Sequence, residues 1–591
     1  MTATSADEPS AGRRAPLAPP FGALTLTWLK LGVVLGLGAA LALRLPAYTT
    51  ETTYFWRQDL GVYLAFLALA IAFGMASPAW LARFAAPLDW SGRGWALALA
   101  ALCLVAGVVG VGLVFDNYTL SLDEFLANFD AKIFASGRLM APLPPAWRGY
   151  EPALAPIYML PVAGNVDWAS GYLPINAAVR ALASKIGAED VVNPALSAFA
   201  IVATFAIGRR LFPEQPRIGA IAAILLGASA QLVVTAMTAY AMPMHLALNL
   251  AWLWLFLRGG RLGHLGAIAV GFFATGIHQL LFHPLFVAPF VLQLWLDRRW
   301  ALAGAYTAAY GMICGFWVEY WPLEMHLAGV TAPAASQLGG GASLIKRLAK
   351  LLGDVSVFNV APMGECLFRF ITWQHPLLAP VAFGGLLAAE RQKGHLRALA
   401  FGVVLTLLAM LVLVPTQSNG WGYRYLHGLL GSTALIAAWT WERMTAALDA
   451  HRRAAANGAM VLATVLALVV FLPLRGWQSW TYCHPYAMAN AEIQGAKTQV
   501  VIVDDQGPIG FDMGTLVRND PFLAGPKVLE ISSLSDDTVA DLCAHYSVSV
   551  FDGAEAKALG IDVVGVPADP NFVAIRKQMA DAHCGVRITH R

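Results

Sequence analysis

The segment Asp116–Gly137 reads DNYTLSLDEFLANFDAKIFASG and follows directly on the apolar segment Trp95–Phe115. The apolar segment is long enough to cross a bilayer, which takes about 20 residues in a helix. The adjacent acids Asp123 and Glu124, at the centre of the polar segment, should therefore lie just outside one membrane face. They are either part of a solvated loop or part of a reaction centre, and the rest of the chain decides which interpretation is preferred.

The composition is that of a polytopic membrane protein. Of the 591 residues, 58% are hydrophobic and only 13% are charged, and the mean hydropathy is +0.60. A soluble globular protein carries roughly 25% charged residues. The net charge of +3 and the lack of any block of Lys and Arg argue against a nucleic-acid partner.

Apolar runs predict about thirteen transmembrane helices. Residues 1–23 form a polar tail without the features of a signal peptide, and residues 24–475 form the predicted membrane domain. The predicted spans are centred near Val34, Leu67, Leu102, Ala200, Ile224, Trp252, Gly271, Ala288, Ala308, Ala382, Leu407, Leu435 and Leu466.

Positive charge in the short loops predicts the orientation, because cytoplasmic loops are enriched in Lys and Arg. With the N-terminus inside, every short inside loop is basic, as at Arg209–Arg210 and Arg298–Arg299. The long polar segments then share the outer side. They are residues 116–190, the hairpin at 278–284, residues 319–365 and residues 476–591.

Two outer segments show helical periodicity. Leu122–Ser136 places Phe125, Phe129 and Ile133 on one face, and Leu173–Ile186 is amphipathic. In the later segment, a run of three glycines precedes Leu344–Val355, which has a basic face that includes Lys346. This pattern predicts a helix in the membrane interface, acting either as a lid or as a solvated connector.

The last segment, residues 476–591, predicts a small soluble α/β domain with a partly parallel sheet. Strands and helices alternate along it. The expected strands are Thr498–Asp504, Lys527–Ile531, Ser547–Asp552 and Val563–Val566, and the expected helices are Ser535–His545 and Asn571–His583.

Four cysteines lie in or near the outer parts: Cys366, Cys483, Cys543 and Cys584. They allow several disulfide pairings. We expect Cys483 to pair with Cys584, which would tie together the two ends of the α/β domain. No Cys or His pair has the spacing of a structural zinc site, so we expect no such metal.

Asp123 and Glu124 follow one another on a predicted helix, so their side chains point about 100° apart. They cannot face one ligand symmetrically, and a division of roles is expected. One would accept a proton, since partial burial moves the pKa of an acid towards the working pH. The alternative is a pair of ordinary solvated acids.

A second constellation is Thr416–Tyr425, which reads TQSNGWGYRY at the outer end of a span. Arg424 offers a planar fork of donors that suits a phosphate. Trp421, Tyr423 and Tyr425 would line a substrate, or they would form an aromatic belt around a snorkelling Arg. Tyr172, in the aromatic-rich first outer segment, is a further candidate for lining the substrate.

The hairpin Gly276–Pro284, GIHQLLFHP, is a third candidate. His278 and His283 could donate to a phosphate or act as acid or base. Alternatively, each is an interfacial residue with one hydrogen bond. Asp504–Gly507, at the end of a predicted strand, is better explained as a turn.

The order of these parts resembles the GT-C class of integral-membrane glycosyltransferases, in its protein O-mannosyltransferase and ArnT-like branch. The similar stretches are SLDEFLANFDAKIFASGRL at 121–139, SGYLPINAAVRALA at 170–183, the arginine-ended stretch at 193–210, and the Arg-Tyr pair in GYRYLHGLLG at 422–431. The resemblance covers about residues 115–441. Two predicted spans, near Val34 and Leu67, precede the one that normally comes first, and His283 stands where related proteins often have a Lys.

The resemblance implies an inverting transferase that moves a sugar from a polyprenyl-phosphate donor to a lipid, glycan or protein acceptor at the outer membrane face. It implies Asp123 as general base and Glu124 as the residue that orients the acceptor or the loop. Arg424, His283, His278 and Lys346 would bind the donor phosphate. The Ala-, Gly- and Leu-rich composition is typical of a bacterium of high genomic GC, hence an inner-membrane protein with a periplasmic C-terminal domain.

Two other functions fit parts of the sequence. A transporter or flippase would move a lipid-linked sugar without chemistry, but transporters tend to have internal repeats and mid-membrane ionisable residues. This sequence shows no convincing repeat, and its ionisable residues cluster at the expected outer face, which favours an enzyme. A non-catalytic scaffold leaves the long first outer segment unexplained. Two adjacent carboxylates can hold a divalent cation, although no ligand spacing demands one.

Overall fold

The computed structural model describes residues 50–85, 92–154, 157–333, 357–389, 394–413, 417–504, 509–510, 515–562, 564–565 and 570–587. The predicted span near Val34 lies outside these residues. So do the three glycines and the predicted interfacial helix Leu344–Val355 with Lys346.

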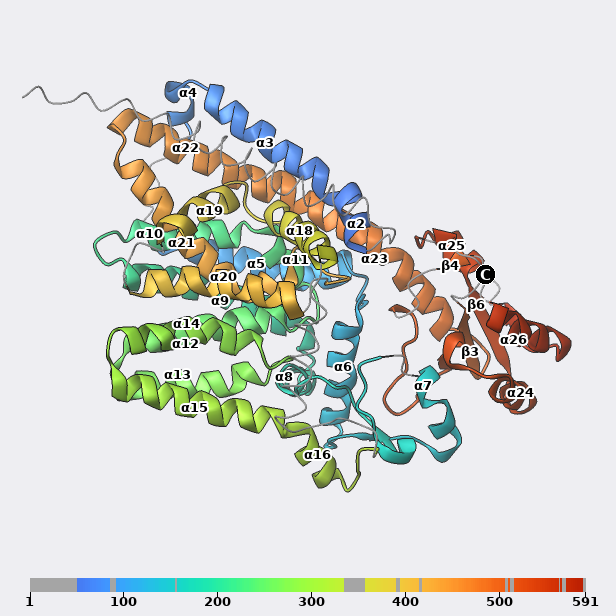
Figure 1. The fold of residues 1–591 in the computed structure, drawn as a ribbon. Helices are drawn as coiled ribbons and strands as arrows, with labels where there is room; N and C mark the ends of the chain where they lie inside the picture. Colours follow the sequence, from blue (N-terminus) through green and yellow to red (C-terminus); the bar gives the residue numbers. More distant parts are fainter. Residues whose placement is uncertain are drawn as a thin grey trace, which may run out of the picture.

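Most of the described chain is a bundle of helices stacked side by side in layers (Figure 1). Apolar helices can pack against each other and against lipid without exposing backbone groups, because each satisfies its own hydrogen bonds. The bundle helices are α2 (Thr50–Tyr54), α3 (Leu60–Met75), α4 (Pro78–Ala82), α5 (Gly94–Leu113), α9 (Val192–Leu211), α10 (Arg217–Gly227), α11 (Ala230–Ala236), α12 (Met242–Arg258), α13 (Gly260–Thr275), α14 (Phe282–Leu296), α15 (Trp300–Val318), α18 (Val357–Thr372), α19 (Leu378–Ala389), α20 (His395–Leu413), α21 (Leu430–Ala446), α22 (Ala450–Leu466) and α23 (Leu472–Gln494).

Within the described ranges, six helices are long and apolar enough to cross a membrane, or seven if the pair α10 and α11, bent by 58°, counts as one span. The chain is therefore an integral membrane protein. The predicted total of about thirteen spans stays a prediction. The six helices are Thr52–Met75, Gly94–Leu113, Glu189–Leu211, Trp300–Val318, His395–Leu413 and Ala450–Gln494.

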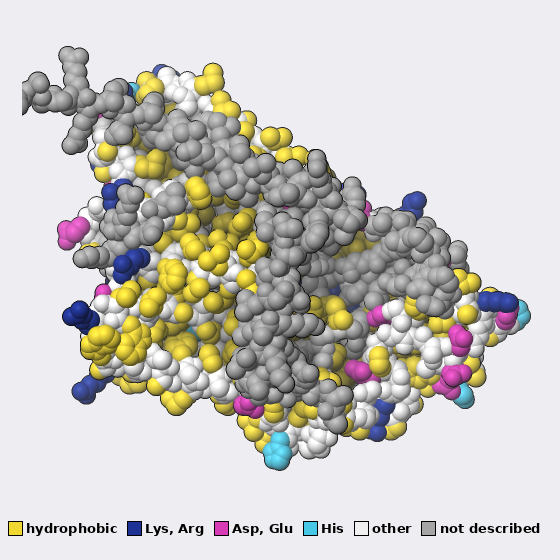
Figure 2. Space-filling model, in the orientation of Figure 1, with side chains coloured by type: hydrophobic (Ala, Val, Ile, Leu, Met, Phe, Trp, Pro, Cys, Tyr) yellow, Lys and Arg dark blue, Asp and Glu magenta, His cyan; other side chains and the backbone are white. Residues whose placement is uncertain are grey.

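Hydrophobic side chains cover much of the bundle face in Figure 2. Lys and Arg gather at its left end, where Figure 1 has the turns from α12 to α13 and from α14 to α15. The helix α6 (Leu122–Ala135) runs across the opposite ends of the bundle helices. The basic turns and the acids of α6 thus lie at opposite ends of the bundle.

A layer of short elements surrounds α6. Strand β1 (Ala141–Pro142) pairs antiparallel with β2 (Asp167–Trp168). The other elements are the helices α7 (Glu151–Leu154), α8 (Ile175–Ser184) and α16 (Tyr320–Ala328). The helices predicted at Leu122–Ser136 and Leu173–Ile186 are confirmed as α6 and a slightly shorter α8.

The C-terminal region holds a parallel four-stranded sheet in the order β5-β3-β6-β8. All five residues of β3 are buried, as expected for a central parallel strand. The predicted strand Val563–Val566 is short and pairs outside this sheet, with Ile509–Gly510. The elements are β3 (Val500–Asp504), β4 (Ile509–Gly510), β5 (Lys527–Glu530), β6 (Val548–Asp552), β7 (Val564–Gly565), β8 (Val586–Arg587), α24 (Asp536–His545), α25 (Gly553–Ala558) and α26 (Pro570–Asp581).

The disulfide differs from the expected one. Cys584 pairs with Cys543, 41 positions earlier, so the expected pairing with Cys483 is wrong. The reason is helix packing. Helix α24, which contains Cys543, packs against α26, and Cys584 follows shortly after the end of α26, so the packing brings the two cysteines together. Cys483 is instead buried in α23, with its sulfur 4.0 Å from the carbonyl of Phe115.

The C-terminal region touches the start of α6 through residues 515–523. The Arg518 guanidinium donates to the hydroxyl of Thr119 at 2.9 Å and to the carbonyl of Leu120 at 2.8 Å. It also lies over the ring of Tyr118, 4.6 Å from the centroid. The indole of Trp168 donates to the carbonyl of Pro521 at 2.8 Å.

Candidate functional site

Asp123, in the first turn of α6, forms an ion pair with Arg424. The Arg424 Nη1 donates to Oδ2 of the carboxylate, and the Tyr172 hydroxyl donates to Oδ1. The side chains of Asp123 and Arg424 are 13% and 10% exposed. The structure thus brings together three residues that the sequence proposed as base, phosphate ligand and substrate-lining residue.

The start of α6 is held by a capping box. The Ser121 hydroxyl accepts from the N–H of Glu124, and the Glu124 carboxylate accepts from the N–H of Ser121 at 3.1 Å. A capping box satisfies two helix-end donors at once. This local pattern fixes the first turn and with it the direction of the Asp123 side chain.

Glu124 points into the protein rather than towards Asp123's partners. It is 1% exposed, and its Oε1 accepts from the N–H of Ala239 at 3.2 Å. Burial raises its pKa to about 7, against the lowering effect of hydrogen bonds from Ser121 and Ala239. Glu124 therefore connects α6 to the break between α11 and α12.

Arg424 lies at the end of the loop Gln417–Arg424, which we call the Arg424 loop. Gln417 binds it twice: its Oε1 accepts from the Arg424 N–H at 2.8 Å, and its carbonyl accepts from Nη2 at 2.5 Å. The guanidinium lies over the rings of Tyr425 and Tyr240, 5.1 and 5.5 Å from their centroids. Two aromatic faces and a carboxylate thus orient the cation.

The Arg424 loop needs glycine at position 422. Gly422 has φ +69°, and a Cβ there would come within 2.4 Å of the Gln231 side chain. Gln231 uses that space to donate to the carbonyl of Tyr423 at 2.8 Å. The Asn-Gly-Trp-Gly stretch noted in the sequence is therefore a tightly packed turn.

Tyr172 is positioned by a second acid of α6. The buried Asp130 carboxylate accepts hydrogen bonds from the N–H of Ser170 at 3.0 Å and from the Ser170 hydroxyl. Ser170 lies in a short antiparallel contact, where the Gly171 N–H donates to the carbonyl of Tyr158 at 2.6 Å. Asp123 and Asp130, two turns apart on one face of α6, thus both accept hydrogen bonds from the segment that carries Tyr172.

The electrostatics favour an ionised Asp123. Burial raises the pKa of this carboxyl group, but the Arg424 guanidinium and the Tyr172 hydroxyl outweigh burial, so its pKa lies below its ordinary value. An acid with a low pKa is a weak base. Loss of either the Arg424 guanidinium or the Tyr172 hydroxyl would raise the pKa of Asp123.

His278 belongs to the same site. Its ring stacks on Tyr172 at 4.0 Å between centroids, and burial lowers its pKa to about 4. Both ring nitrogens lack a hydrogen-bond partner in the described part of the chain. Buried polar groups are normally hydrogen-bonded, so this unpartnered imidazole calls for an explanation.

Three other proposed residues, all within the described ranges, are not brought to Asp123. His283 is buried in α14, with Nδ1 bound to Asn249 at 2.7 Å and Nε2 bound to Tyr310 at 2.8 Å. Tyr423 and Trp421 are also buried: the Tyr423 hydroxyl contacts the sulfur of Met363, and Trp421 packs on Phe115 and Trp373. Lys346 lies outside the described residues.

A small cavity with a mixed polar and apolar lining adjoins Arg424 and Tyr425. Its volume of about 10 Å³ is close to that of one water. His245 also lines it, 2% exposed, and neither of its ring nitrogens has a hydrogen-bond partner among the described residues. Tyr425 is thus the proposed lining residue that does face a cavity.

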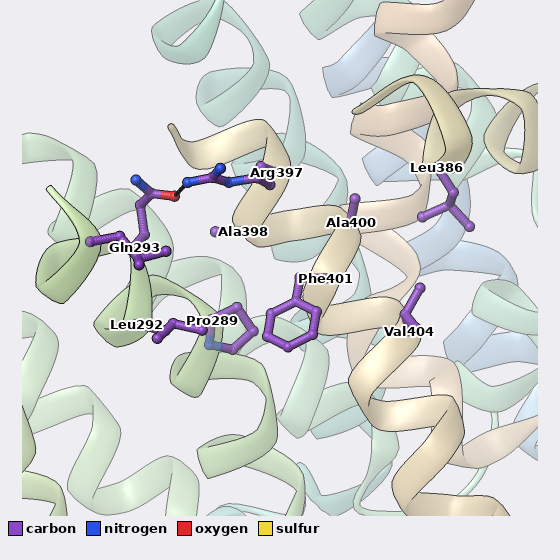
Figure 3. A pocket seen from close by; sticks show the side chains of 10 residues that line it. Pro289, Leu292, Gln293, Leu386, Arg397, Ala398, Ala400, Phe401 and Val404 are labelled. Carbon is purple, nitrogen blue, oxygen red and sulfur yellow. Dashed lines mark hydrogen bonds between the residues drawn. The ribbon is translucent and has the colours of Figure 1, made fainter. Parts of the chain in front are cut away.

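A larger groove of about 520 Å³ lies between α14 and α20 (Figure 3). It is mostly apolar, and at one end Arg397 donates to Gln293 at 2.7 Å. None of the residues around Asp123 lines it. This groove is therefore separate from the residues around Asp123.

In the described ranges, no group of three or more His, Cys, Asp or Glu side chains is arranged to hold a metal ion. Asp504, considered as a turn residue, accepts two hydrogen bonds from Arg576, each at 2.6 Å. That ion pair accounts for its place at the end of β3.

No family model matches the chain, and no curated protein matches it. Two solved structures of ArnT from Cupriavidus metallidurans are similar to it. The structure bound to undecaprenyl phosphate has 15% identity and a TM-score of 0.47, and covers 74% of this chain and 86% of its own. The apo structure has 13% identity and a TM-score of 0.45, with coverages of 73% and 85%. Identities this low do not carry a function from one chain to another.

Sequence reasoning missed several residues that build the site. Gln417 lies inside the quoted stretch Thr416–Tyr425, but nothing local shows that it binds Arg424. Tyr240 lies in a polar break between two apolar runs, a signal that marks irregular backbone. The bond from Asp130 to Ser170 spans 40 positions and has no local signature.

Proposed function

We propose that this protein is an inverting glycosyltransferase that moves a sugar from a polyprenyl-phosphate donor to an acceptor at the outer face of the membrane. The observation that carries the proposal is the ion pair of Asp123 with Arg424. An acid that can take a proton and a cation that suits a phosphate share one largely buried site. The sequence resemblance to the GT-C class supports the same function.

In the proposed reaction, Asp123 takes the proton of an acceptor hydroxyl. The acceptor oxygen forms a bond to the anomeric carbon while the bond from that carbon to the phosphate oxygen breaks. The electron pair leaves with polyprenyl phosphate, and the configuration at carbon inverts. Arg424 stabilises the negative charge that gathers on the departing phosphate.

Donor binding would also prepare the base. Arg424 holds the pKa of Asp123 down, and a phosphate competes for the same guanidinium. As Arg424 turns to the phosphate, burial of Asp123 dominates and raises its pKa. Asp123 then becomes a better proton acceptor only when a donor is present, which limits wasteful hydrolysis.

The other proposed residues take narrower roles. Tyr172 holds the Asp123 carboxylate in place. His278 beside Tyr172 and His245 beside Arg424 offer imidazoles without hydrogen-bond partners among the described residues. Glu124 orients the loop rather than the acceptor, through Ser121 and Ala239. His283 is a structural residue of α14 in this proposal, since both ring nitrogens are bound within the bundle.

The topology that accompanies this function has three parts. Residues 1–23 are a cytoplasmic tail, residues 24–475 form the membrane domain with outer segments 116–190 and 319–365, and residues 476–591 form a soluble outer domain. In a bacterium these place the protein in the inner membrane with the last part in the periplasm. The basic turns opposite α6 support this orientation.

The test uses purified full-length protein in detergent with a polyprenyl-phosphate-linked sugar. Addition of an acceptor, offered separately as lipid extract, glycan or peptide, should release free polyprenyl phosphate. Asp123→Asn should lower the rate by roughly 10²-fold or more, the usual size of a general-base contribution. Asp116→Asn is the matched control, because Asp116 lies in the same segment but pairs with His484.

The outcomes separate the candidate functions. Release that depends on Asp123 supports the transferase. Movement of the donor across vesicle membranes without release would identify a flippase instead. Near-normal turnover in Asp123→Asn, with normal membrane insertion, would exclude Asp123 as the general base.

A further inference from the structure

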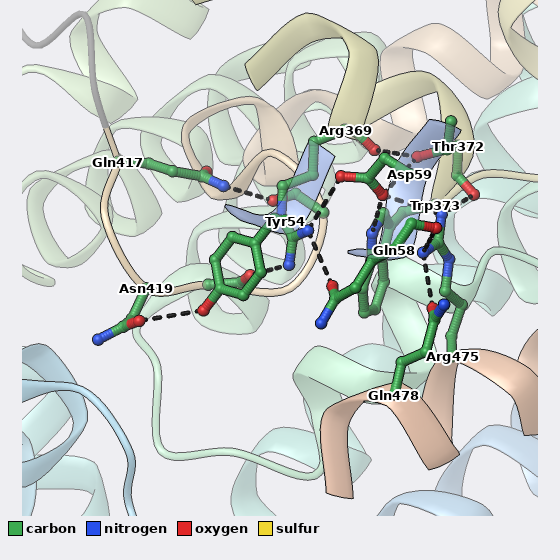
Figure 4. A network of polar contacts seen from close by, with 12 residues as sticks. Tyr54, Gln58, Asp59, Arg369, Thr372, Trp373, Gln417, Asn419, Arg475 and Gln478 are labelled. Atoms are coloured by element: carbon green, nitrogen blue, oxygen red, sulfur yellow. Dashed lines mark hydrogen bonds and ion pairs between the residues drawn. The ribbon is translucent and has the colours of Figure 1, made fainter. Parts of the chain in front are cut away.

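Charged side chains from three distant parts of the chain meet inside the protein next to the Arg424 loop (Figure 4). Asp59 pairs through Oδ2 with Arg369 Nη1 at 3.1 Å and through Oδ1 with Arg475 Nη2 at 3.0 Å. The three side chains are at most 2% exposed. The group lies outside the site built around Asp123.

The acid of this group is fully used. The hydroxyl of Thr372 and the indole of Trp373 also donate to Asp59 Oδ1, at 2.8 and 3.0 Å. The two guanidiniums lie over the Trp373 ring, 4.9 and 4.6 Å from its centroid. The desolvation penalty of buried charges often exceeds their mutual attraction, and well-packed apolar residues in their place are often as stable. What the group holds is therefore more informative than its own stability.

Arg369 holds the Arg424 loop. Its second arm, Nη2, donates to the carbonyl of Gly420 at 2.6 Å. Its guanidinium also lies 3.9 Å from the ring centroid of Tyr54, whose hydroxyl donates to Asn419 at 3.0 Å. Two successive residues of the loop are thus fixed from one side, four and five positions before Arg424.

Arg475 makes no such contact with the loop. Its remaining hydrogen bonds go to the carbonyls of Gln58 and Thr372, both at 2.9 Å, and to the side chain of Gln478 at 2.8 Å. Both arginines share the same acid, but Arg369 is the one that links it to the loop. This asymmetry gives a matched pair for experiment.

We propose that Arg369 is a positioning residue: anchored on Asp59, it fixes the Gly420 carbonyl and thereby holds Arg424 in register with Asp123. The effect on donor binding rests on the proposed function, whereas the effect on the loop does not. The helix that begins at Thr50 then has a second task besides crossing the membrane, because it supplies both Asp59 and Tyr54.

The first measurement is the mobility of a nitroxide attached at Ser418→Cys, an exposed position of the loop. The unsubstituted protein, whose free cysteines include buried Cys103, Cys366 and Cys483, gives the labelling background. Arg369→Lys keeps a charge for Asp59, but one ammonium cannot serve both Asp59 and Gly420 as the planar fork does. The label should become clearly more mobile in Arg369→Lys and stay unchanged in Arg475→Lys.

The second measurement is binding of polyprenyl phosphate and KM for the lipid-linked donor. Arg369→Lys should weaken polyprenyl-phosphate binding and raise the KM for the donor, each at least fivefold, with a smaller change in kcat. In Arg475→Lys both quantities should stay within twofold of wild type. Tyr54→Phe, which keeps the ring under Arg369 and loses the bond to Asn419, is a milder variant and should mobilise the label in the same direction.

Equal effects of the two lysine variants on label mobility and on KM would overturn the proposal, because the group would then be merely structural. If the wild-type protein binds no polyprenyl phosphate, the proposed function fails. The nitroxide result still decides whether Arg369 holds the loop.

Discussion

The guanidinium of Arg424 binds the carboxylate of Asp123 across 301 positions of sequence. The pair joins α6 to the Arg424 loop, two segments that follow different membrane helices. Since both side chains are largely buried, each neutralises a charge that would otherwise be costly. Removal of either partner therefore affects stability as well as chemistry, and the two effects have to be measured apart.

A double variant separates them. Arg424→Gln alone leaves Asp123 buried without its cation and should destabilise the protein by about 3 kcal/mol, the usual order for half of a buried pair. Asp123→Asn with Arg424→Gln should recover at least half of that loss in thermal unfolding. Sugar transfer should stay at least roughly 10²-fold below wild type in both. Full recovery of transfer in the double variant would exclude Asp123 as the base.

Tyr172→Phe tests the hydrogen bond that lowers the pKa of Asp123. Without the hydroxyl, the carboxylate is less stabilised and its pKa rises. The acid limb of kcat/KM, which reports the free enzyme, should therefore move to higher pH, while the rate at pH 8 falls by less than about tenfold. An unmoved limb would show that a group other than Asp123 controls it.

Glu124 should make stability depend on pH. Its pKa of about 7 lies above the ordinary value near 4.3, so the folded protein holds this proton more tightly than the unfolded chain. Stability should fall as pH rises through that window. In Glu124→Gln this part of the fall should vanish, so the difference in Tm between variant and wild type should favour the variant more at pH 8 than at pH 5.

The disulfide prediction concerns the C-terminal region. A digest without reductant should yield a peptide that links Cys543 to Cys584. Closing a loop of this length stabilises by about 4 kcal/mol in the chain-entropy model. Cys543→Ser should therefore make the region around α24 and α26 markedly more sensitive to protease. A peptide linking Cys483 to Cys584 would contradict the structure.

Local pattern predicted much of the fold. The apolar stripe of Phe125, Phe129 and Ile133 located α6 to within a residue at each end, because a helix face depends on near neighbours. The strands β3 and β6 were also predicted, because each is a run of apolar, strand-favouring residues that is visible locally. β8 was missed because it spans two residues, Val586–Arg587, and is held by its pairing with β6 rather than by its own composition.

The candidate site was only half accessible from sequence. Loop charges predict that Asp123 and Arg424 lie on the same side of the membrane, but their contact depends on how the bundle closes. One signal was present and unused: Ser121-Leu-Asp-Glu124 has the spacing of a capping box, which indicates that Glu124 serves the helix end. His283 is bound by Asn249 and Tyr310, which lie on other helices, so its partners have no local signature in the sequence.

The hydrogen bonds of Arg518 to Thr119 and Leu120 can form only late in synthesis of the chain. The two ends of this contact are separated by up to 399 positions, so a ribosome adding about 5–20 residues per second makes them roughly 20–80 s apart. For that interval the newly inserted helices hold α6 without its final support. A nascent chain cut before residue 518 would carry Asp123 and Arg424 without the hydrogen bonds from Arg518 to Thr119 and Leu120.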